Sequence, residues 1–166
     1  MNNSVQAEVQ RLVFLLDVVT QASKHLQFTS ERVFSRSLTL ERVENLESTP
    51  EDAEQIEAFV SRFARLQDNL GAKLLPSYLQ AVGERQNTLL GNLDKAERLG
   101  LIESADNWMT MRKLRNQMVH EYIQEPSILL DALNAGFTFV PQLISTSKKL
   151  QQAVNQFLAR HQQGKA

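Results

Sequence analysis

The stretch that decides the fold is ADNWMTMRKLRNQMVHEY, residues 105–122. Its large side chains recur at alternating steps of three and four residues, and this spacing is typical of a helix that packs against another helix. The residues on this seam are Trp108, Met111, Arg115, Met118 and Tyr122. Ser104, just before the stretch, is a residue type that caps helix starts, and Pro126, just after it, ends the helical pattern. The stretch therefore predicts one helix of an α-helical bundle.

Helical patterns also cover most of the remaining chain, because apolar residues recur at three- and four-residue steps and good helix formers dominate the composition. We expect a kink at Pro76 and a bend at Pro141, where a helix interior loses a backbone donor. The expected helices cover residues 4–27, 30–46, 50–82, 86–99, 105–122 and 127–160. No strand pattern, linker or repeat interrupts them. The sequence thus predicts a single all-α domain over residues 1–166, an up-and-down bundle of about five to six helices.

Two helix boundaries carry specific signals. Thr49 is expected to be an N-cap, with Pro50 at the first helical position and Asp52 at the capping-box position. Gly100, followed by Leu101, is expected to end the helix over 86–99 as a glycine C-cap.

The composition excludes several kinds of chemistry. The chain has no cysteine, so it has no disulfide, thiolate nucleophile or cysteine-ligated zinc. Its three histidines are scattered, with no H-x3-H or acid-rich cluster, so we expect no metal and no cofactor. The first residues lack a basic start and a cleavage site, and no run of about 18 apolar residues occurs. We therefore expect a cytoplasmic protein without a signal peptide or membrane span.

Charge is distributed unevenly along the chain. The net charge of −1 argues against a constitutive binder of nucleic acid duplexes, which are usually basic. Residues 41–57 hold seven acids and one arginine, whereas no acid follows Asp131. The basic residues after Asp131 are Lys148, Lys149, Arg160 and Lys165. Two interpretations stay open: two solvated faces of opposite sign, or an acidic partner or phosphate backbone lying along the C-terminal helix.

Arg115 stands on an otherwise apolar stripe, and a buried guanidinium without a partner costs several kcal/mol. We therefore expect Arg115 to have a partner or to open into a cleft. Asp68 is the candidate partner, because Ala64, Asp68 and Ala72 form a small-residue face that allows close helix approach. The alternative is that Asp68 is simply solvated.

A polar stripe of Arg112, Asn116 and His120 runs beside the apolar one. Asn116 can reach toward His120 and orient its ring. Arg115 and His120 are five residues apart, which places them about 140° apart around a helix. They make a poor catalytic pair within one chain, but two copies could converge across a two-fold axis.

RNQMVHEY, residues 115–122, resembles the R-N-x3-H-x-Y form of the R-x4-H motif of HEPN domains. The chain looks most like the toxin members of bacterial toxin–antitoxin pairs whose partner is a minimal nucleotidyltransferase. FARLQDNLGAKLLP (63–76) and LDKAERLGLIESADNW (93–108) also look like that group. The similarity covers roughly residues 55–130, and the first 50 and last 30 residues carry no motif that matches.

The resemblance implies a metal-independent ribonuclease toxin that acts on RNA as a homodimer. Carried over by position, the catalytic residues are Arg115, Asn116 and His120. Tyr122 would contact RNA or be adenylylated by the nucleotidyltransferase antitoxin. Two other functions stay open: a non-catalytic subunit that binds a nucleotide or substrate for a nucleotidyltransferase, and a helical bundle that serves only for dimerisation.

Overall fold

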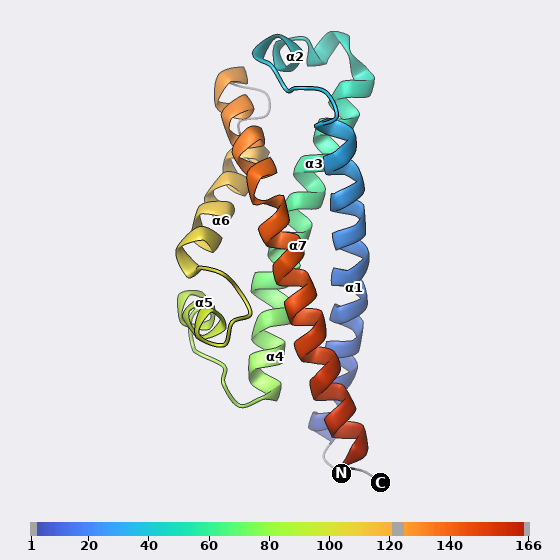
Figure 1. The fold of residues 1–166 in the computed structure, drawn as a ribbon, viewed down its shortest axis with the longest axis vertical. Coiled ribbons are helices and arrows are strands. Elements are labelled where there is room, and N and C mark those ends of the chain that lie inside the picture. Colours follow the sequence, from blue (N-terminus) through green and yellow to red (C-terminus); the bar gives the residue numbers. More distant parts are fainter. Residues whose placement is uncertain (1–2, 121–124, 165–166) are drawn as a thin grey trace.

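The computed structural model describes residues 3–120 and 125–164, and every regular element in these ranges is helical (Figure 1). The α-helices are α1 (Asn3–Val33), α2 (Leu40–Glu44), α3 (Pro50–Asp68), α4 (Leu75–Ala81), α5 (Leu89–Arg98), α6 (Ala105–His120) and α7 (Pro126–Gln163). A 3₁₀ turn, η1 (Leu46–Ser48), precedes α3, and a π-helical segment, η2 (Asn69–Leu74), joins α3 to α4. The predicted all-α class is confirmed.

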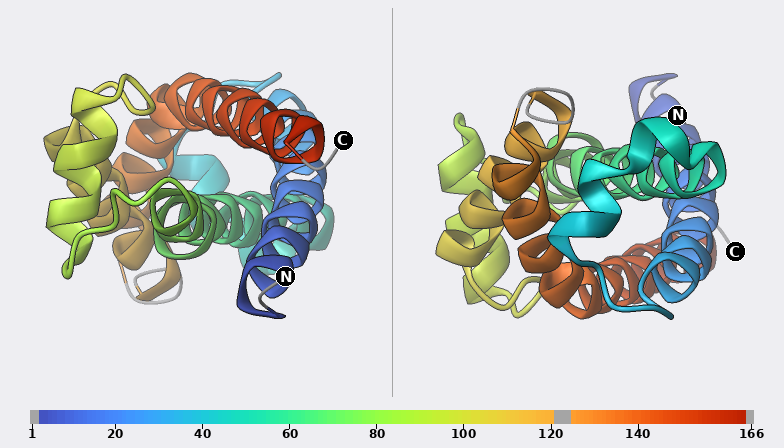
Figure 2. Two further views of the ribbon diagram at one scale, coloured as in Figure 1. Left: turned by 90° about the horizontal axis from the view of Figure 1, so that it is seen from below. Right: turned by 90° about the horizontal axis from the view of Figure 1, so that it is seen from above.

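Four long rods make up the bundle: α1, the continuous α3–η2–α4 rod, α6 and α7 (Figure 1). Neighbouring rods run up and down, and the end-on views show them arranged around a common axis (Figure 2). Both chain ends lie at one end of the bundle, and α2 crosses the other end. Apolar side chains from all four rods form one core cluster, with Phe59, Phe63 and Trp108 among its largest fully buried members. Burial of this apolar stripe on each rod is what holds the bundle together.

The expected helix over residues 30–46 is wrong. Helix α1 continues to Val33, residues 34–39 are not helical, and only Leu40–Glu44 forms α2. The segment between the two helices is held by a side chain of α2. The guanidinium of Arg42 donates to the backbone carbonyls of Val33 (2.9 Å) and Arg36 (3.2 Å). It thereby satisfies acceptors that the end of a helix leaves open, so α1 stops where Arg42 can reach it.

At the start of α3, the predicted N-cap residue Thr49 and first helical residue Pro50 are confirmed, but the predicted capping-box hydrogen bonds are absent. Thr49 is the N-cap residue, but its side chain accepts no backbone N–H there. Asp52 instead accepts hydrogen bonds from Arg42 (3.1 and 3.2 Å) and from Arg36 (2.8 Å). The Arg42 side chain is only 8% exposed and that of Arg36 is 69% exposed, so the Arg42–Asp52 pair is the shielded part of the cluster that joins the end of α1 and α2 to α3.

Low pH should weaken the interaction between Asp52 and the two arginines. The hydrogen bond from Arg42 holds the pKa of Asp52 below its ordinary value of 3.8, although partial burial opposes the shift. A depressed folded-state pKa stabilises the protein above the unfolded value, and the stabilisation is lost as the pH falls through the folded pKa. We predict that Asp52→Asn lowers the free energy of unfolding at neutral pH by about 1.5–3 kcal/mol, the range for hydrogen bonds to charged groups. Below pH ~3.8, this difference from wild type should shrink.

Urea unfolding curves of both proteins across this pH range measure the effect. Asp131→Asn, which removes an exposed acid of α7, is the matched control and should change little. An Asp52→Asn difference that stays constant as the pH falls would contradict the prediction.

The boundaries around α6 follow local sequence signals. Gly100 adopts a φ of +71°, and the Leu101 N–H donates to the Ala96 carbonyl (2.9 Å), so the predicted glycine C-cap of α5 is confirmed. The Asn107 N–H donates to Ser104 Oγ (3.1 Å), so the predicted N-cap of α6 is confirmed as well. The short loop between these two caps sets the orientation of α6 relative to α5.

Helix α7 runs through Pro141 without ending there. It is the one helix of the described ranges that is long and apolar enough to cross a membrane by length and composition. Core helices of soluble proteins meet the same criteria, and about a third of its most apolar window is buried in the bundle. The expectation that nothing spans a membrane stays a prediction.

Candidate functional site

Helix α6 is held at its start by a close contact with η2. Trp108 is 1% exposed, and its indole lies directly against Gly71. A Cβ added at Gly71 would stand 2.7 Å from Trp108 Nε1, which is closer than packed side chains come. Only glycine at position 71 therefore allows the Trp108 side chain to be buried this deeply.

A second close contact holds the other end of α6 on α7. Met118 is fully buried, and a Cβ added at Gly136 would stand 3.3 Å from its sulfur and methyl carbon. Met111, between these two anchors, is also buried. The predicted seam of Trp108, Met111 and Met118 is thus confirmed as buried. Its last member, Tyr122, lies outside the described residues.

Arg115 lies at the edge of this seam and is half-buried. Its Nε is buried and has no hydrogen-bond partner, and within residues 3–120 and 125–164 no ion pair reaches it. The candidate partner, Asp68, is exposed at the end of α3 and forms no ion pair with Arg115 in these ranges. Arg115 therefore lies at the edge of the core with one guanidinium donor, the Nε, buried and unpaired.

Asn116 and His120 are both exposed on α6. No hydrogen bond joins their side chains in the described structure, so the expected orienting role of Asn116 has no contact to support it here. Since α6 is helical up to His120, Arg115 and His120 stand about 140° apart around its axis and about 7.5 Å apart along it. One chain therefore does not bring the three residues to a common point.

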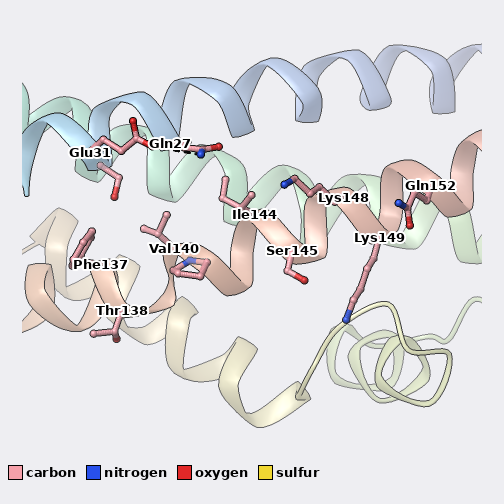
Figure 3. A pocket seen from close by; sticks show the side chains of 12 residues that line it. Gln27, Glu31, Phe137, Thr138, Val140, Ile144, Ser145, Lys148, Lys149 and Gln152 are labelled. Atoms are coloured by element: carbon pink, nitrogen blue, oxygen red, sulfur yellow. Dashed lines mark hydrogen bonds between the residues drawn. The ribbon is translucent and has the colours of Figure 1, made fainter.

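The pocket drawn in Figure 3 lies on another face, between α1 and α7. Its volume is about 710 Å³, and Val140, Ile144 and Phe137 contribute to a mostly apolar wall. Lys148 and Lys149 stand near one end and Glu31 near the other (Figure 3). Arg115, Asn116 and His120 line neither this pocket nor the smaller pockets described on other faces of residues 3–120 and 125–164.

Sequence patterns missed a polar cavity beside α6. Gln67 of α3 is 2% exposed, and its Oε1 is buried without a hydrogen-bond donor. It lines a cavity of about 30 Å³ together with Asp68, Trp108 and Arg112, a volume that admits about one or two water molecules. The structure therefore places Asp68 beside Arg112, at the same cavity, and not in an ion pair with Arg115. A glutamine next to an exposed aspartate gives no sequence signal for this.

No group of three or more His, Asp or Glu side chains in the described ranges could hold a metal ion. Comparisons of the chain with protein-family models, with curated proteins and with solved structures found no match. Any assignment of function must therefore rest on the residues of α6 and on what surrounds them.

Proposed function

We propose that the chain is a HEPN-like ribonuclease toxin that cleaves RNA without a metal, as a homodimer, with Arg115, Asn116 and His120 at the site. One observation supports this most strongly. Arg115 keeps a buried, unpartnered Nε, the exposed Asn116 follows it directly in α6, and the exposed His120 lies about one and a half turns further along. Leaving such a donor unpaired costs about 1–3 kcal/mol. The Nε itself lies below the surface, but Arg115 is only half-buried, so in the proposal the terminal nitrogens of its guanidinium meet an oxyanion.

These residue types suit the transesterification of RNA. A neutral His120 takes the proton of a 2′-hydroxyl, whose oxygen attacks the adjacent phosphorus. The bond from phosphorus to the 5′-oxygen breaks, and a protonated His120 of a second copy gives that oxygen its proton. The products are a 2′,3′-cyclic phosphate and a 5′-hydroxyl. Arg115 donates from its planar fork to the phosphoryl oxygens as negative charge develops on them.

The homodimer is part of the proposal because one chain does not bring these groups together. Helix α6 separates Arg115 and His120 by about 140°, and no described pocket encloses them. A two-fold axis near α6 would place two copies of the exposed face opposite each other and form a cleft between them. Asn116 would then orient His120 or hold a phosphate.

In the proposal, regulation acts on Tyr122, which lies outside the described residues, two positions after His120 in the sequence. The nucleotidyltransferase antitoxin would transfer adenylate to its hydroxyl. The added phosphate brings negative charge and bulk, which repel RNA from the cleft.

A second candidate function is a non-catalytic subunit that binds a nucleotide or substrate for a nucleotidyltransferase. The exposure of His120, with no hydrogen bond from Asn116, favours it, because a general base is usually held in place by a neighbour. Growth arrest on expressing the chain alone would favour the ribonuclease over this alternative.

The experiment that tests the proposed function is cleavage of single-stranded RNA by the purified protein in EDTA. We predict that cleavage persists, leaves 2′,3′-cyclic phosphate ends, and is catalysed by a species that light scattering shows to be a dimer. An oligonucleotide of the same sequence with every 2′-hydroxyl replaced by hydrogen is the matched control and should stay intact. Activity that disappears in EDTA and returns with a divalent ion would contradict the metal-independent mechanism, and a stable monomer at micromolar concentration would contradict the shared site.

A further inference from the structure

A polar pocket of about 420 Å³ lies between α1 and the η2–α4 segment. Three of its lining residues are cationic and come from three separate parts of the chain: Arg11 from α1, Lys73 from η2 and Arg85 from the loop after α4. Ser77 and Gln80 of α4 add a hydroxyl and an amide. The wall therefore combines positive charge with neutral hydrogen-bond donors.

The positive charge of this pocket is not neutralised within the protein. The ion pairs of the described residues join Arg36 and Arg42 to Asp52 and Lys95 to Glu84, so none reaches Arg11, Lys73 or Arg85. Glu8 is the one carboxylate on the wall, which leaves three cations and one anion, a net charge of +2. Such a surface attracts a polyanion, and arginine forks with a lysine match the oxygens of a phosphate group.

The pocket adjoins the small cavity beside α6. Ala72 lines it and also lines the small cavity that holds Asp68 and Arg112. Arg112 in turn lies on α6, about 12 Å along the helix axis from His120. The π-helical segment η2 contributes Ala72 and Lys73 to the wall, and π turns often occur at functional sites. An extended chain of phosphates could therefore follow cations from Arg85 and Lys73 past Arg112 to Arg115.

We infer that the pocket lined by Arg11, Lys73 and Arg85 binds a phosphate group of the RNA backbone, away from the bond that is cut. This inference rests on the proposed function for the identity of the polyanion. The small net charge of the chain does not oppose it, because the cations gather on this wall while the excess acids of residues 41–57 lie toward the other end of α3.

The test measures binding of a labelled single-stranded RNA by fluorescence anisotropy, in a His120→Gln background that does not cleave it. Lys73→Gln with Arg85→Gln is expected to weaken binding about tenfold or more at moderate salt. It should also lower the slope of log K against log salt by about 1.4, since each lost single-strand phosphate contact accounts for about 0.7. Glu8→Gln should tighten binding, because it removes the one opposing charge.

The matched control is Lys24→Gln with Arg98→Gln, the same change of charge at two exposed cations that line none of the described pockets. It should leave the salt slope unchanged. Equal effects of the two double variants would overturn the inference. Binding of inorganic pyrophosphate that depends on Lys73 and Arg85, with RNA binding unaffected by them, would overturn it in favour of a site for free nucleotides.

Failure of the phosphate site and failure of the proposed ribonuclease function can be distinguished. RNA binding that depends on Lys73 and Arg85, together with wild-type protein that cuts no RNA, would keep the phosphate site and reject the ribonuclease. Thermal melts of all variants check the fold, and they should match wild type because Lys73 and Arg85 are exposed.

Discussion

His120→Gln is expected to abolish RNA cleavage while leaving the fold intact. An amide cannot take up or release a proton near neutral pH, and general acid–base catalysis contributes about 10²–10⁴-fold to rate. In a homodimer both copies lose the group, so the base and the acid disappear together. His120 is exposed at the end of α6 and packs into no core, so the variant should melt like wild type. Initial cleavage rates and thermal melts of the two proteins make the comparison.

His25→Gln is the control for this experiment. His25 is also an exposed helical histidine, on α1, and the same chemical change there should leave cleavage unaltered. If His120→Gln melts like wild type and cleaves RNA at the wild-type rate, the ribonuclease proposal is wrong. The non-catalytic binding subunit would then be the better account of α6.

Arg115→Lys is expected to impair cleavage nearly as much as Arg115→Ala, by about 10²–10³-fold, the usual effect of losing one donor to a transition-state oxyanion. An ammonium keeps the charge but loses the planar, two-pronged geometry. The structure adds a second expectation. Because Arg115 Nε is buried without an acceptor, Arg115→Met should remove an unpaired donor and raise the melting temperature while cleavage is lost.

Measuring cleavage and melting on the same preparations separates the two roles of Arg115. Arg98→Lys, at an exposed position of α5, is the matched control and should change neither quantity. A marked fall in the melting temperature of Arg115→Met would mean that Arg115 stabilises the bundle, which would remove the main support for the site. Full activity of Arg115→Lys would show that charge alone suffices.

The sequence predicted the features of this fold that depend on neighbours along the chain. Ser104 caps the start of α6 and Gly100 caps the end of α5, as expected, because capping depends on residues only a few positions apart. The features that it did not predict depend on side-chain contacts between residues 6 to 16 positions apart, which no helical spacing or capping pattern reveals. Residues 34–39 leave the helix because Arg42 binds the carbonyls at the end of α1, and Asp52 serves Arg36 and Arg42 rather than its own helix.

The same division applies to the candidate site. Periodicity placed Arg115 on the apolar seam, where the structure shows it half-buried, and put His120 on a different side of α6. It did not anticipate that Asp68 lies beside Arg112, because η2 replaces the regular helix that the spacing of Ala64, Asp68 and Ala72 assumes. The pocket of Arg11, Lys73 and Arg85 had no sequence pattern, since its cations come from three separate segments.

The contact between Gly71 and Trp108 gives the protein a natural optical probe. Trp108 is the single tryptophan of the chain, so all indole fluorescence comes from the place where α6 rests on η2. Its emission should be blue-shifted while the indole is shielded and should move to the red when α6 separates from the rod. Trp108 also lines the cavity of Arg112, so a polyanion passing that residue should change the emission without any attached label. Unfolding of α6 and occupation of the surface beside it can therefore be followed in the unmodified protein.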